Sequence, residues 1–80
     1  MNNEDSIIFT VQEVAKILHS SPNYIYLLIN KGYLPAIKLK SIKILKSSLV
    51  KFLSDNEGMD FSDIENIKKL DRINIGEFNG

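Results

Sequence analysis

Two short helices with clearly marked ends are the feature that most constrains the fold. Thr10 and Glu13 match a capping box, in which the Thr side chain is expected to cap the helix start and the Glu side chain to return to the cap backbone. Apolar residues then recur at helical spacing, which predicts a first helix as far as about Leu18.

The second helix is marked at both ends. Ser21 is a good N-cap, and Pro22 suits the first helical position because its missing N–H has no partner to lose there. Gly32 is expected to adopt the left-handed conformation that ends a helix. The residues expected to face inward are Ile25, Leu28 and Ile29. A turn of about three residues joins the two helices, and His19 within it is expected only to tolerate a positive φ.

Alternation of apolar and polar residues over 36–44 predicts a β-hairpin with one buried face. With the turn at Lys40-Ser41, the predicted pairs are Leu39 with Ile42, Ile37 with Ile44, and Lys38 with Lys43. Two lysines directly opposite each other destabilise a hairpin, and a bound anion would remove that penalty.

A third helix is expected after the hairpin, with Ser47 or Ser48 as its N-cap. The residues expected to return to the core are Leu49, Phe52 and Leu53. The predicted fold class is therefore mainly α with a small β-hairpin: a winged helix-turn-helix, followed by a C-terminal helix.

The chain is predicted to contain a flexible N-terminus (1–8), the winged helix-turn-helix domain (9–54) and an acidic C-terminal tail (55–80). In the tail, Ser62 and Glu65 match a capping box for a helix of about 10 residues. Its apolar residues recur every third position: Phe61, Ile64, Ile67 and Leu70. Three roles stay open for them: docking on the same chain, pairing with a second copy, or binding a partner protein.

Charge is segregated along the chain although the net charge is zero. Residues 1–54 hold seven lysines and three acids, and residues 55–80 hold seven acids and three bases. This asymmetry favours a polyanion as partner for the first part. A more pointed hypothesis is that the acidic tail folds onto the basic face and lowers non-specific DNA affinity.

Several classes of function are excluded by what the chain lacks. It has no cysteine and a single histidine, so no disulfide, thiolate chemistry or Cys/His zinc site is expected. No pairing of nucleophile with base and no glycine-rich phosphate loop is present, so we expect neither an enzyme nor a cofactor. The chain has no apolar run of about 18 residues and no basic signal-peptide start, which favours a cytoplasmic protein. Because the chain is short, no sensor domain is expected.

Four segments together resemble the excisionase family of DNA-binding domains, which are relatives of MerR-type winged helices. The segments are 9–18, 21–26, 30–36 and 44–53, and the most specific is Gly32-x-Leu34-Pro35-Ala36, about ten residues after Ser21-Pro22. Members of this family are phage and transposon excisionases, which bind and bend DNA beside an integrase, and small transcriptional regulators.

The resemblance implies that the second helix enters the major groove and that the wing reaches a minor groove or phosphates. The implied DNA-binding residues are Ser21, Pro22, Asn23, Tyr24, Tyr26, Leu27, Asn30, Lys31, Lys38, Lys40, Ser41, Lys43 and Lys46. Relatives usually have arginine or lysine where Tyr26, Leu27 and Asn30 stand. Asn23, Tyr26, Leu27 and Asn30 are expected to form one exposed stripe on the second helix. Because asparagine pairs with adenine and apolar groups contact the thymine methyl, this stripe favours A·T-rich duplex DNA.

The sequence therefore predicts an excisionase-like DNA-binding protein, acting either as a recombination directionality factor or as a transcriptional regulator. The alternative is a protein-interaction module that has kept the winged fold and lost DNA binding. The stripe on the second helix could then contact protein, and the wing lysines could simply protect a sheet edge.

Overall fold

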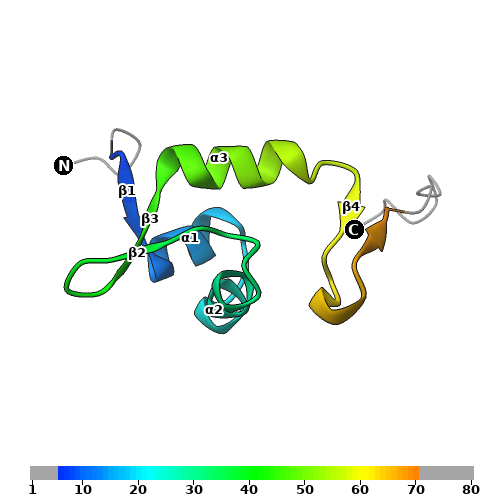
Figure 1. Cartoon of the computed structure of the whole chain (residues 1–80), viewed down its shortest axis with the longest axis horizontal. Helices are drawn as coiled ribbons and strands as arrows, with labels where there is room; N and C mark the ends of the chain where they lie inside the picture. Colours follow the sequence, from blue (N-terminus) through cyan, green and yellow to red (C-terminus); the bar gives the residue numbers. More distant parts are fainter. Residues whose placement is uncertain (1–5, 71–80) are drawn as a thin grey trace.

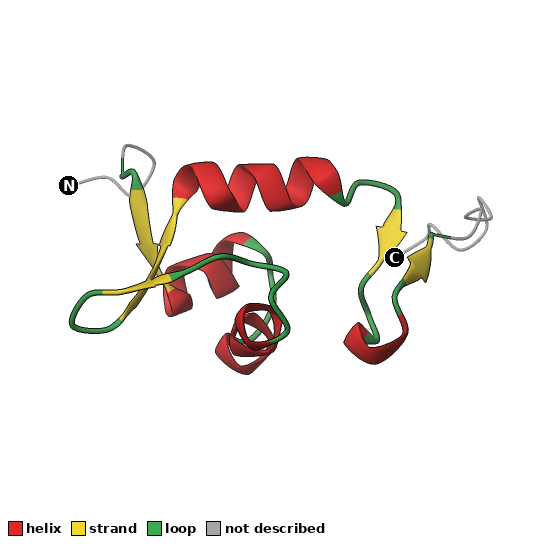
Figure 2. Ribbon diagram, in the orientation of Figure 1, coloured by secondary structure: helices red, strands yellow, loops and turns green. Residues whose placement is uncertain are grey.

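The structure, a computed structural model, describes residues 6–70 (Figures 1 and 2). The helices of this part are α1 (Val11–Ile17), α2 (Pro22–Asn30) and α3 (Lys46–Asp55), with a 3-10 turn at Ile64–Asn66. One antiparallel sheet has the strand order β1 (Ile8–Thr10), β3 (Ile42–Leu45), β2 (Ile37–Lys38). A second, two-stranded sheet pairs β4 (Met59–Asp60) with β5 (Lys68–Lys69).

The two predicted helices and the turn between them are confirmed. The Glu13 N–H donates to Thr10 Oγ1 (3.1 Å), and the Thr10 N–H donates to Glu13 Oε1 (2.9 Å), which completes the capping box. Ser21 caps α2 by accepting from the Tyr24 N–H (3.3 Å). Gly32 has φ +84° and His19 has φ +53°, so both occupy the left-handed conformation expected of them.

Strand β1 was not anticipated from the sequence. Phe9 pairs with Ile44 of β3, and residue 8, assigned above to a flexible N-terminus, pairs with Leu45. The Ile7 carbonyl also accepts from the Lys46 N–H (2.8 Å). A strand of three residues is too short to show a period, so its only sequence signal was the apolar run just before the Thr10 cap.

The predicted register of the hairpin is wrong by one residue. Ile37 pairs with Lys43 and Lys38 with Ile42, because the loop holds three residues, 39–41, instead of forming a two-residue turn. A shift of one residue moves side chains to the opposite face of a strand. Ile37 is therefore 47% exposed instead of buried, and Leu39 in the loop is 58% exposed. Lys38 and Lys43 do not face each other, so the predicted like-charge penalty does not arise.

Helix α3 begins earlier than predicted. Its N-cap is Leu45, which makes no side-chain cap hydrogen bond, so the expected caps Ser47 and Ser48 are wrong. The physical reason is that β3 runs directly into the helix, and the Ile7 carbonyl accepts the hydrogen bond of the first helical N–H.

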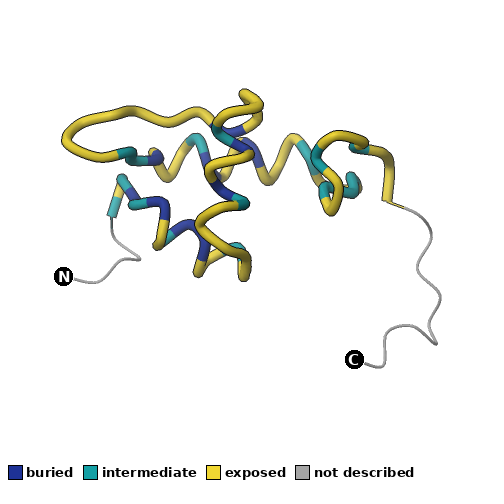
Figure 3. Tube along the Cα trace, turned by 90° about the horizontal axis from the view of Figure 1, so that it is seen from below, coloured by how far each residue is buried: buried dark blue, intermediate teal, exposed yellow. Residues whose placement is uncertain are grey.

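The core lies between the three helices and the inner face of the first sheet (Figure 3). Its buried residues are Phe9, Val11, Val14, Ala15, Ile25, Leu28, Leu34, Ile44, Leu49 and Phe52. Leu53, which was expected to be in the core, is 42% exposed. Residues 59–70 include no fully buried position, and Figure 3 shows them as intermediate or exposed.

The expected C-terminal helix of about ten residues is wrong. Residues 59–69 instead form a small hairpin, β4 and β5 with the 3-10 turn between them, which we call the C-terminal hairpin. The Asp60 carboxylate accepts from the Ser62 N–H (2.9 Å) and hydroxyl (2.6 Å), and Asp63 accepts from the Glu65 N–H (3.1 Å). Such local side-chain bonds offer the backbone an alternative to the helix.

Two of the four apolar residues that recur every third position in the tail dock on the same chain. Phe61 and Ile64 pack against the core of the same chain. Leu70 is half exposed, at 50%. The predicted period of three placed these residues on one helix face, but the hairpin separates them.

Candidate nucleic-acid interface

The exposed face of α2 contains the four central residues of the predicted interface. They are Asn23, Tyr26, Leu27 and Asn30, all exposed. Ile25 and Leu28 on the opposite face are buried, which fixes the rotation of the helix. Tyr26 is 41% exposed and Leu27 is 48% exposed, so the stripe offers both polar and apolar groups to a partner.

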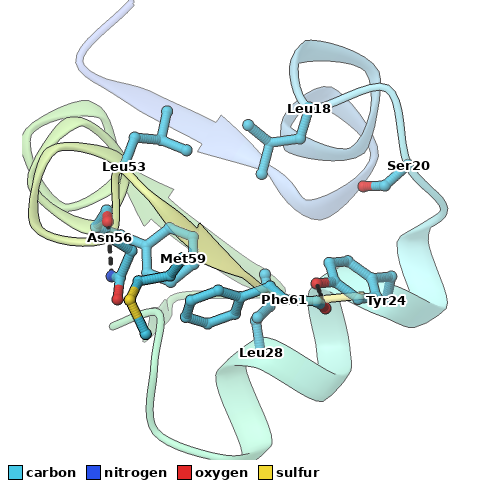
Figure 4. Close-up of a pocket in the computed structure, with 9 residues that line it drawn as sticks. Leu18, Ser20, Tyr24, Leu28, Leu53, Asn56, Met59 and Phe61 are labelled. Carbon is cyan, nitrogen blue, oxygen red and sulfur yellow. Dashed lines mark hydrogen bonds between the residues drawn. The ribbon is translucent and has the colours of Figure 1, made fainter. Parts of the chain in front are cut away.

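The flank of the same helix is covered in part by the C-terminal hairpin. The Tyr24 hydroxyl donates to the Phe61 carbonyl (2.6 Å; Figure 4). Lys31 forms an ion pair with Glu65. A groove between the two elements is lined by Tyr24, Leu27, Lys31, Ser62, Asp63, Ile64 and Glu65. Two residues predicted to face DNA therefore contact the chain itself.

The hairpin of β2 and β3 presents its lysines on both faces. Lys38 shares a face with its partner Ile42, and Lys43 lies on the other face beside Ile37. Lys40 and Ser41 are exposed in the loop, and the Lys43 ammonium donates to Ser41 Oγ (2.5 Å). Lys46 follows β3 as the first residue of α3. In Figure 1, α2 lies between this hairpin on the left and the C-terminal hairpin on the right.

The two ends of this surface differ in charge. The β2–β3 hairpin carries Lys38, Lys40 and Lys43 and no acid, whereas the C-terminal hairpin carries three acids, Asp60, Asp63 and Glu65, and the two lysines of β5. The sequence raised the hypothesis that the acidic tail folds onto the basic face, and in the structure Glu65 of this tail pairs with Lys31. It did not identify Glu65 and Phe61 as the residues that contact the flank of α2.

Ionisation of Tyr24 should report on the contact with the C-terminal hairpin. Burial and, secondarily, the Asp60 carboxylate raise the pKa of Tyr24 above its ordinary value of 10.0. The folded state therefore favours the neutral phenol of Tyr24. This group contributes its full stabilisation below pH 10.0, and the contribution is lost as pH rises through the raised pKa of Tyr24. We expect Tyr24→Phe to remove a high-pH component from the tyrosinate absorbance titration. A titration curve of the variant with the same high-pH component would contradict the assignment.

Two further kinds of functional element are absent from the described part of the chain. Among residues 6–70, no helix has the length and apolar character to cross a membrane. Within the same range, no group of three His, Asp or Glu side chains gathers as a metal site would require.

The chain was compared with known proteins and families. Neither the curated proteins nor the solved structures include a match to it. A family model described as a helix-turn-helix domain matches residues 8–57, from β1 to just beyond α3. This match indicates a DNA-binding domain, and it covers most of the chain, including α1, the turn and α2. The chain belongs to the helix-turn-helix domain family.

Proposed function

We propose that this protein binds duplex DNA in the excisionase manner, with α2 in the major groove and the β2–β3 hairpin as a wing. The observation that supports this best is the exposed stripe on α2, the second helix of the helix-turn-helix. Asn23 and Asn30 can pair with adenine, and Leu27 can contact a thymine methyl, which favours an A·T-rich site.

The arrangement of lysines on the β2–β3 hairpin supports a role as a wing. Because Lys38 and Lys43 lie on opposite faces, a hairpin that enters a groove can approach the phosphates of both strands. Lys40 lies at the tip between them, and Lys46 at the base. Four phosphate contacts would give a slope of log K against log salt near −3.6.

The biological role we propose is that of a recombination directionality factor or a small transcriptional regulator. Both roles need sequence-specific duplex binding, and bending of the DNA would follow from simultaneous insertion of helix and wing. Because Phe61 and Ile64 pack against the core of the same chain, contact with an integrase or a second copy would use another surface.

The alternative function is a protein-interaction module with the same fold. The exposed apolar side chains Tyr26, Leu27, Ile37 and Leu39 favour this alternative. Such a module would show weak salt dependence, because its contacts would bury apolar groups instead of releasing counterions.

The deciding experiment is a titration of a labelled A·T-rich duplex with the full chain, followed by fluorescence anisotropy at several salt concentrations. A slope of about −3 or steeper supports the proposed function. Absence of binding even at low salt would overturn it and favour the protein-interaction module.

A further inference from the structure

The C-terminal hairpin places carboxylates on the flank of α2. Glu65 pairs with Lys31, the residue that directly follows α2, and Asp63 lines the same groove. Lys31 follows the exposed stripe of the helix, and in the proposed complex its ammonium group would contact a DNA phosphate. The carboxylate of Glu65 is therefore paired with the ammonium group that would contact a phosphate in the proposed complex.

The hairpin is held in place mainly by apolar contacts. The Phe61 ring packs edge-on against Phe52 (centroid distance 5.4 Å, interplanar angle 85°) and against Tyr33 (5.4 Å, 79°). Ile64 also packs against the core. The hydrogen bond from the Tyr24 hydroxyl to the Phe61 carbonyl adds a polar contact. Docking therefore does not depend on the ion pair.

The packing of the C-terminal hairpin against the core is nevertheless limited in extent. A cleft of about 270 Å³ opens beside Phe61, between the helices and the start of the C-terminal hairpin (Figure 4). Its apolar walls include Leu18, Leu53 and Met59. No residue of the C-terminal hairpin is fully buried. Segments with few buried contacts open locally at low free-energy cost, so this one can leave α2 while the core stays folded.

The ion pair itself is weak. The Lys31 and Glu65 side chains are 43% and 70% exposed, and exposed pairs of this kind contribute little to stability. Removing the Glu65 charge should therefore leave the hairpin docked through Phe61 and leave the fold intact. This makes Glu65 a site where charge can be changed separately from structure.

We infer that the C-terminal hairpin is a built-in competitor of DNA: Glu65 holds Lys31 in place of a phosphate and thereby lowers DNA affinity. The inference rests on the proposed function, since it presupposes that α2 faces DNA. It gives the acidic part of the chain a regulatory role, because any event that displaces the hairpin would free Lys31 and increase affinity.

The test compares Glu65→Gln with Glu57→Gln in the full chain. Glu57 is exposed and lies in the turn after α3, so its substitution makes the same change in net charge away from Lys31. The gain is limited by the strength of the ion pair that DNA must break, which for exposed side chains amounts to a factor of about two to five in affinity, and the freed Lys31 adds about 0.9 to the steepness of the salt slope. We expect this gain for Glu65→Gln, and none for Glu57→Gln. In a Lys31→Ala background, Glu65→Gln should give no gain.

The outcomes separate the inference from the proposed function. If the unmodified chain binds DNA and the two Gln variants have equal affinities, the inference is wrong and the proposed function stands. A gain that persists in the Lys31→Ala background also overturns the inference, because it would reflect general charge repulsion. If none of these proteins binds DNA at low salt, both the inference and the proposed function fail.

Discussion

Replacement of Leu28 with alanine is expected to lower the free energy of unfolding by about 3 kcal/mol, within the range of about 2–5 kcal/mol typical of buried leucines. Leu28 is 1% exposed and lies at the centre of the core, on the inner face of α2. The substitution leaves a cavity that the surrounding helices fill only in part. For a chain of 80 residues this is a large part of the total stability. Urea denaturation followed by circular dichroism measures the loss.

The adjacent residue supplies a matched control. Leu27 is 48% exposed, so Leu27→Ala removes the same atoms from the surface and should change stability by no more than about 0.5 kcal/mol. The DNA titration should respond in the opposite order, since Leu27 lies in the exposed stripe. Equal losses of stability in the two variants would show that α2 does not bury the face that contains Leu28 and expose the face that contains Leu27. The assignment of the interface would then be wrong as well.

The helix-turn-helix could be predicted from the sequence because its determinants are local. The Thr10 capping box, the Ser21-Pro22 start and the left-handed Gly32 each act within one turn of backbone. The apolar period then fixed which face of each helix is buried. Local signals of this kind need no knowledge of the rest of the fold, and the exposed stripe on α2 followed from them directly.

The hairpin register could not be predicted in the same way. The alternation over 36–44 favours a two-residue loop, which places all its apolar residues on one face, whereas the three-residue loop that forms places Ile37 on the same face as Lys43. The choice between them depends on how β3 pairs with β1 and continues into α3, which are non-local constraints. The predicted register placed Lys38 and Lys43 on one face, whereas the observed register places them on opposite faces, which changes how a wing would meet DNA.

The C-terminal hairpin was mispredicted because a short helix is marginal on its own. The apolar spacing of three from Phe61 to Leu70 matched a helix, but the carboxylates of Asp60 and Asp63 accept hydrogen bonds from backbone and hydroxyl groups two residues further on. Tertiary contacts of Phe61 with Phe52 and Tyr33 then stabilise the alternative. The sequence indicated an acidic segment in need of a docking site, and only the structure places it on α2.

Removal of three wing charges is expected to produce the largest change in DNA affinity. In the variant Lys38→Gln, Lys40→Gln, Lys43→Gln, each substitution keeps most of the aliphatic stem and removes one ammonium group. Each lost phosphate contact costs about 0.9 in log K near 0.1 M salt, so the three together predict a loss of about 500-fold. The salt slope should fall from about −3.6 to about −0.9. Anisotropy titrations of the same A·T-rich duplex at several salt concentrations measure both quantities.

A second triple variant separates the position of the charges from their number. Lys51 on α3 and Lys68 and Lys69 on β5 are exposed and lie outside the β2–β3 hairpin. Their replacement by glutamine gives the same net charge as the wing variant, so general electrostatic attraction to DNA falls equally in both. We expect this control to keep a slope near −3.6, because its lysines make no phosphate contact in the proposed complex. If the two variants lost affinity equally, net charge alone would account for the binding, and the β2–β3 hairpin would have no role as a wing.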